Sequence, residues 1–138
     1  MDLLTIVLAA LSSYVFGAFW YLVLSKRWIE SSGVGVDPAT GRPANASDPV
    51  PYITGFVAAL LVAGMMNYVF HTSGIDTVSL GLATGLGFGL FIVSPWIATF
   101  YGFSDRPRAL VLIDAGYATI GCGLMGAVLA LARPSSLT

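Results

Sequence analysis

The chain has 138 residues, of which 57% are hydrophobic and only 9% are charged, and its mean hydropathy is +0.85. A soluble domain carries about a quarter charged residues, so this composition excludes an ordinary water-soluble fold and predicts an integral membrane protein. The net charge of -1 also argues against nucleic acid as a partner, because a nucleic-acid surface needs a clustered basic field.

Four long apolar runs follow one another along the chain, at residues 3–24, 52–70, 78–101 and 109–132. Each run is long enough to cross about 30 Å of hydrocarbon as a helix. A helix satisfies its own backbone groups in lipid, whereas a lone strand does not, and the runs are continuously apolar rather than alternating. The sequence therefore predicts an all-α fold in which residues 1–138 form a single membrane domain, a bundle of four transmembrane helices.

Positive charges are distributed unevenly between the two ends of the predicted bundle. Five of the six Lys and Arg residues lie in the first and third connections: Lys26, Arg27, Arg42, Arg106 and Arg108. Because basic connections tend to stay in the cytoplasm, we expect both termini on the same, non-cytoplasmic side. Residues 33–51 of the first connection are rich in Pro, Gly, Asn and Ser, which is typical of a flexible loop, here a cytoplasmic one.

Small residues recur at intervals of four in the predicted helices, and in lipid such stripes let helix backbones approach closely. The stripes are Ser13 and Gly17 in the first run, Gly55, Ala59 and Ala63 in the second, and Gly81, Gly85 and Gly89 in the third. We predict that they are contact faces between helices of one bundle. The alternative is that a stripe serves self-association or contact with a larger membrane-protein partner.

Asp114 is the one charged residue inside an apolar run, about 7 to 8 Å from the start of its helix at about 1.5 Å per residue. An intramembrane carboxylate is costly and should face the bundle interior, where hydrogen-bond donors can reach it. When residues are counted inward from the helix ends, aromatic hydrogen-bond donors on the neighbouring helices lie at the same depth as Asp114. One of these donors, Trp96, lies seven residues after Gly89, which predicts that it shares the tightly packed face of its helix. The predicted polar layer consists of Asp114, Tyr117, Trp96, Tyr21 and Trp20.

This layer has two interpretations. In the first it is structural, with the aromatic donors satisfying the carboxylate and fixing the register of the helices, and with Arg106 or Arg108 reaching in from the adjacent connection. In the second it is a proton or ligand site in a half-open cytoplasmic cavity, because intramembrane carboxylates often mark such sites.

Residues for metal or nucleophilic chemistry are scarce in this chain. It has one His and one Cys, and these lie on different levels from Asp114, so no metal site, haem or other cofactor is expected. His71 and Asp76 share a short connection that we interpret as a turn with a helix cap. We therefore predict that the protein is not an enzyme.

Two motifs resemble a bacterial family of short integral membrane proteins known as domain of unknown function 1761. Their residues are Trp20, Tyr21, Leu24, Lys26 and Trp28 in the first, and Arg106, Pro107, Leu110, Leu112, Ile113, Asp114, Ala115, Gly116 and Tyr117 in the second. The resemblance covers essentially the whole chain and implies a four-span bundle of the bacterial inner membrane, with no assigned reaction, ligand or partner. Ser25 and Ala118 stand where other members often have Phe and His, and the second departure argues against a His–Asp proton relay.

The leading hypothesis from the sequence is a small non-enzymatic component of the bacterial inner membrane. It would act as a bundle that associates with itself or with another membrane protein through its glycine faces. The alternative is a transporter or channel subunit in which Asp114 titrates or binds a small solute or cation. A single bundle of four helices has little room to enclose a solute pathway, so transport would require an oligomer.

Overall fold

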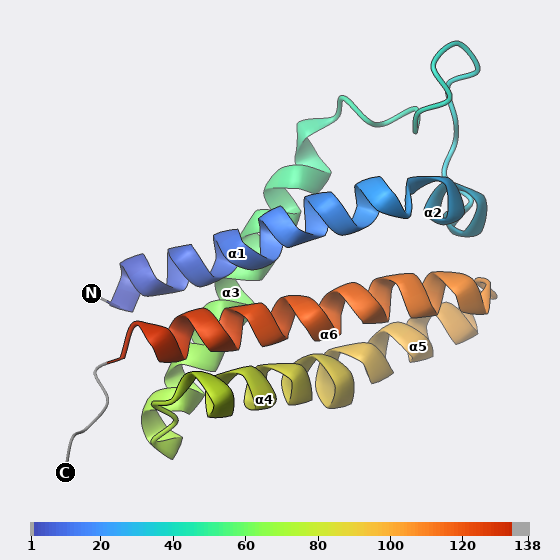
Figure 1. Ribbon diagram of the computed structural model, residues 1–138. Coiled ribbons are helices and arrows are strands. Elements are labelled where there is room, and N and C mark those ends of the chain that lie inside the picture. The colour runs from blue at the N-terminus through green and yellow to red at the C-terminus, as the bar shows by residue number, and fades with distance from the viewer. Residues whose placement is uncertain (1, 134–138) are drawn as a thin grey trace.

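The computed structural model describes residues 2–133, and this part of the chain is helical without β-strands (Figure 1). Its elements in chain order are α1 (Asp2–Val23), α2 (Ser25–Ser32), α3 (Pro49–Ser73), α4 (Val78–Phe88), the π-helical turn η1 (Gly89–Val93), α5 (Ser94–Phe103) and α6 (Arg108–Leu131). Because α4, η1 and α5 run on without a break, four helices are long and apolar enough to cross a membrane. The predicted all-α architecture with four potential spans is confirmed.

Helix α3 is longer than its apolar run because the residues that cap it lie outside that run. The Asp48 side chain accepts a hydrogen bond from the Val50 amide at 3.0 Å, and Pro49 occupies the first turn, where its missing N–H costs nothing. At the other end Gly74, with φ +67°, terminates the helix in the left-handed conformation. The helix therefore extends three residues beyond the apolar run 52–70 at each end.

The segment expected as a flexible loop at 33–51 ends earlier than predicted, because α3 begins at Pro49. Its first part forms a small turn closed by an antiparallel bridge between Val36 and Pro43. Asp37 holds this turn, since its carboxylate accepts a hydrogen bond from the Ala39 amide at 2.9 Å.

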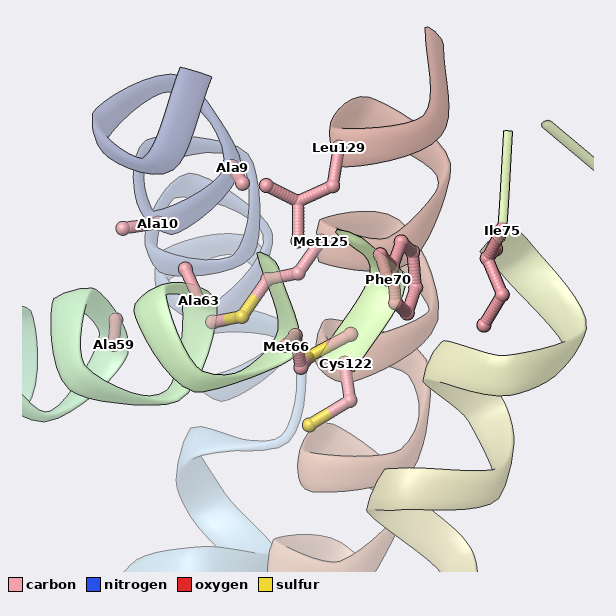
Figure 2. Close-up of a cluster of buried hydrophobic side chains, with 10 residues drawn as sticks. All are labelled: Ala9, Ala10, Ala59, Ala63, Met66, Phe70, Ile75, Cys122, Met125 and Leu129. Atoms are coloured by element: carbon pink, nitrogen blue, oxygen red, sulfur yellow. The ribbon is translucent and has the colours of Figure 1, made fainter. Parts of the chain in front are cut away.

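Helix α6 lies at the centre of the fold, with α1 on one side and the α4–α5 span on the other. Helix α3 packs mainly on α1 and crosses behind α1 and α6 at a steep angle in Figure 1. Figure 2 shows the core that these helices share, in which Ala63 of α3 points toward Ala9 and Ala10 of α1. Small side chains at this crossing let the two helices approach closely.

The π-helical turn η1 changes the face that the third span presents to α6. Pro95 has no N–H and its ring disfavours a normal helical turn before it, and the Ser94 amide bonds to the carbonyl of Gly89, five residues back. The Ser94 hydroxyl donates to the same carbonyl at 2.7 Å. One extra residue in this turn rotates everything after it by about 100°, so Gly81, Gly85 and Gly89 are followed on the buried face by Ser94.

Candidate functional site

Asp114 of α6 is held by two tyrosine hydroxyls from two other helices. Tyr21 of α1 donates to its Oδ1 at 2.6 Å, and Tyr101 of α5 donates to its Oδ2 at 2.6 Å. All three side chains are partly buried. Hydrogen bonds this short to a carboxylate are charge-assisted and stronger than neutral ones, so the trio links three helices at one level.

Trp20 and Tyr117 lie beside this trio but bond to other groups. The indole Nε1 of Trp20 donates to the backbone carbonyl of Ile113 at 3.0 Å, and its ring lies against Gly116, where a Cβ would come within 2.8 Å of it. The ring of Tyr117 packs edge-on against that of Tyr21, with centroids 5.4 Å apart. These two predicted members therefore support the helix contact around Asp114 and are not its bonded partners.

The hydroxyl of Tyr117 extends the polar contacts along α1. It donates to the Ser13 carbonyl at 3.4 Å, and the hydroxyls of Ser13 and Tyr117 are 3.5 Å apart. Its ring fills the space beside Gly17, where a Cβ would lie 2.7 Å from a ring carbon. The Ser13 and Gly17 stripe is thus the surface of α1 that receives a large side chain of α6.

Trp96 does not belong to the polar layer, so this part of the prediction is wrong. Its side chain is 60% exposed and stacks on Phe100, with ring centroids 5.6 Å apart. The prediction extended the four-residue repeat from Gly89 through an unbroken α-helix, whereas η1 shifts the buried face by one residue.

Tyr101 of α5 takes the place in the polar layer that was predicted for Trp96. It lies seven residues after Ser94, which puts it on the same helix face once the repeat is restarted there. Tyr101 was not among the residues predicted for the polar layer, although its hydroxyl bonds to Asp114. The signal that could have found it is the Ser94–Pro95 pair, since proline next to a small-residue repeat indicates a change of helical phase.

The glycine stripe of the third span packs directly on the backbone of α6. A Cβ at Gly81 would meet the Gly126 carbonyl, one at Gly85 the Cys122 carbonyl, and one at Gly89 the Ala118 carbonyl. On α3, Ala59 and Ala63 are buried in the core, and a Cβ at Gly55 would lie 3.6 Å from the Tyr14 ring. These small residues therefore lie at contacts between helices of one chain.

The basic residues near the first and third connections lie at one end of the bundle. Lys26 and Arg27 are exposed on α2. Arg106 in the α5–α6 connection and Arg108, the first residue of α6, are also exposed. The guanidinium of Arg106 lies against Gly33, whose φ of +71° ends α2. Within residues 2–133, no salt bridge joins Arg106 or Arg108 to Asp114.

The chemistry available around Asp114 is that of one carboxylate and several hydroxyls. Across residues 2–133, no three His, Cys, Asp or Glu side chains come together in a way that could hold a metal ion. The trio can tie helices together, and it can also hold a proton between carboxylate and phenol oxygens.

Replacing Trp20 with phenylalanine is expected to lower the free energy of unfolding by about 1 kcal/mol, because it removes one interhelical hydrogen bond in lipid. The matched variant Trp96→Phe should leave stability unchanged, since that indole is exposed and stacks only on Phe100. Denaturant unfolding in detergent micelles measures both. Equal losses for the two variants would contradict the assignment of Trp20 and Trp96.

Comparison with known proteins identifies the chain at the level of its family. No curated protein and no solved structure matches it. The family model described as protein of unknown function DUF1761 matches residues 4–130, a range that includes the whole Asp114 layer. The chain therefore belongs to the family DUF1761, a family of proteins of unknown function.

Proposed function

We propose that this protein is a non-enzymatic structural or interaction component of the bacterial inner membrane. The observation that carries the proposal is the arrangement at Asp114, where each carboxylate oxygen accepts a 2.6 Å bond from a tyrosine of a different helix. A carboxylate with both oxygens bonded in this way serves helix register. The basic residues at the α2 end of the bundle support a cytoplasmic location for that end.

A face of α4 other than the predicted glycine stripe is available for association with a second chain. Gly81, Gly85 and Gly89 are already occupied by α6. On the opposite side of α4, the small residues Ser79 and Ala83 are exposed, and a Cβ at Gly87, four residues further on, would meet nothing within 4 Å. We propose that a second copy of the chain packs there, because this face repeats the spacing that admits α6 on the other side.

The variant Gly87→Leu tests this proposal without disturbing the fold, since its side chain enters open space. We expect it to reduce association of the labelled protein in lipid vesicles, measured by energy transfer between copies. Ala98→Leu adds similar bulk at an exposed site of α5 and should leave association unchanged. A wild-type protein that stays monomeric in vesicles, or a Gly87→Leu variant that associates equally well, would refute the proposal.

A transporter or channel subunit is the second candidate function, and the partial exposure of Asp114, Tyr21 and Tyr101 favours it. A carboxylate that is only partly buried can exchange a proton or a cation with the medium around it. If this function holds, Asp114→Asn abolishes proton or cation flux in reconstituted vesicles while the protein stays folded. Wild-type vesicles without flux at any pH tested would exclude it.

A further inference from the structure

His71 lies at the end of the bundle opposite α2, where the start of α1, the end of α3 and the residues after α6 surround a pocket of about 430 Å³. It belongs to the last turn of α3, and the helix cap expected in the connection after it is provided by Thr77. The charged side chains that line the pocket are Asp2 of α1, Asp76 of the α3–α4 connection and Arg133, which follows α6. The pocket therefore brings both ends of the described chain to one histidine.

Arg133 holds the end of α3 and the connection after it through both terminal nitrogens of its guanidinium. Nη1 donates to the Ile75 carbonyl at 2.8 Å, and Nη2 lies 2.7 Å from Nδ1 of His71. A guanidinium only donates hydrogen bonds, so Nδ1 accepts this one, and the ring is neutral with its proton on Nε2. The contact between Arg133 and His71 therefore requires an uncharged ring.

The other nitrogen of the same ring is directed at α1. Nε2 of His71 lies 3.6 Å from Oδ2 of Asp2, which is too long for a hydrogen bond from a neutral ring, whereas an imidazolium would form an ion pair with this carboxylate. The side chains of His71 and Asp2 are 47% and 69% exposed, so water can deliver a proton to the ring. The ring thus lies between a cation that requires its neutral form and an anion that favours its charged form.

A proton on Nδ1 reverses the preference of the ring for its two neighbours. It replaces the acceptor with an N–H that faces the guanidinium of Arg133 and brings two positive charges together. Imidazole is the side chain that ordinarily changes charge between pH 5 and 8, so mild acid is sufficient for this step. Asp76 lines the same pocket but has an interaction of its own, and the reversal requires no change in it.

We propose that His71 is a pH-sensitive link that changes its partner from Arg133 to Asp2 when it takes up a proton. In the neutral state the end of α3 is joined to the residues after α6, and in the protonated state it is joined to the start of α1. The bond from Arg133 to the Ile75 carbonyl does not involve the ring, so Arg133 pivots about that carbonyl and stays in the pocket. This link is separate from the Asp114 layer and does not depend on the function proposed for the protein.

The two partners can be tested by titrating the ring signals of the single histidine, by NMR of the full-length protein in lipid nanodiscs between pH 8 and pH 5. Arg133→Leu removes the partner of the neutral ring, so protonation should move to higher pH by about half a unit, a change of about threefold that is typical of one partly exposed contact. Asp2→Asn removes the partner of the charged ring and should move protonation to lower pH by a similar amount. Arg108→Leu and Asp105→Asn make the same changes at the opposite end and should leave the titration in place. An unchanged titration in Arg133→Leu or Asp2→Asn, or shifts of both in one direction, would overturn the proposal.

The side-chain signals of Arg133 test the exchange of partners itself. They are assigned in protein labelled with ¹⁵N-arginine by their absence from Arg133→Leu, and they should shift between pH 8 and pH 5 together with the ring of His71, because the guanidinium loses its acceptor. His71→Asn keeps a neutral acceptor close to the position of Nδ1 and takes up no proton in this range, so it should abolish the shift. Arg133 signals that ignore pH in the wild type, or that shift equally in His71→Asn, would refute the exchange.

The carboxylate of Asp2 tests the acid state. Its ¹³C signal, assigned by its absence from Asp2→Asn, should follow the titration of the ring as the imidazolium approaches it, and this transition should disappear in His71→Asn. The carboxylate of Asp105 at the opposite end is the internal control and should show no transition with the midpoint of the ring. A transition at Asp2 that persists in His71→Asn would belong to the carboxylate itself and would contradict the proposed link.

Discussion

Replacing Gly85 with alanine is expected to lower the free energy of unfolding by about 3 kcal/mol, an overpacking cost at the upper end of the usual range. The new methyl group would overlap the Cys122 carbonyl and come within 3.0 Å of the Gly123 Cα. Both are backbone atoms of α6, and a backbone cannot rotate away as a side chain can. The two helices would have to separate along the stripe that joins them. Denaturant unfolding in mixed micelles measures the loss.

Gly87→Ala is the matched control for this prediction. It makes the same chemical change two residues further along the third span, where a Cβ meets nothing within 4 Å. Alanine is favoured over glycine in a helix, so this variant should be as stable as the wild type or slightly more stable. A loss of stability at Gly87 as large as that at Gly85 would show that general glycine effects, rather than contact with α6, govern this span.

The second large effect is expected when Tyr21 and Tyr101 are both changed to phenylalanine. This double variant removes both hydroxyls that bond to Asp114 and leaves a carboxylate among membrane helices without these donors. Each bond of this kind is worth about 1 to 2 kcal/mol in lipid, so the free energy of unfolding should fall by about 3 kcal/mol. Either single variant should cost about half as much.

The triple variant Tyr21→Phe, Tyr101→Phe and Asp114→Leu distinguishes the loss of the hydrogen bonds to Asp114 from other effects of changing the tyrosines. It removes the carboxylate together with both hydroxyls, so no polar group is left unpaired at this level, and replacing all partners with apolar groups can be nearly neutral. We expect most of the lost stability to return. A triple variant as unstable as the double one would mean that the hydroxyls act through contacts other than Asp114.

The helical spans were predictable because each depends on a property that is local in sequence. A run of about 20 apolar residues spans the membrane wherever it occurs, and the four runs correspond to the four long helices. The depth of Asp114 was predictable in the same way, from the rise per residue along one helix. Its partner Tyr21 also followed, because α1 has no irregularity between its end and that residue.

The errors in the Asp114 layer have a single geometric cause. The prediction of Trp96 assumed a constant helical period from Gly89 onward, and η1 breaks this period just before Pro95. A shift of one residue rotates side chains by about 100°, which is enough to move Trp96 to the outside and bring Tyr101 to the carboxylate.

A polar pocket at the end of the bundle opposite α2 shows a different limit of prediction from sequence. Its lining comes from residues as far apart in the chain as Asp2 and Arg133. No local pattern in the sequence links them. Only the crossing of α3 behind α1 and α6 brings its end to the two termini of the described chain.

The sequence alone thus determined that the protein is helical with four helices long and apolar enough to cross a membrane, and that the one carboxylate within these apolar runs, Asp114, lies near the start of its helix. These properties follow from transfer free energies and helix geometry, which act residue by residue along the chain. The tertiary structure decided which side chains bond to Asp114, that α6 occupies the glycine stripe of α4, and that Asn67 lines a polar pocket. Those outcomes depend on helix phase and on the crossing of helices, and both are set by packing between segments distant in sequence.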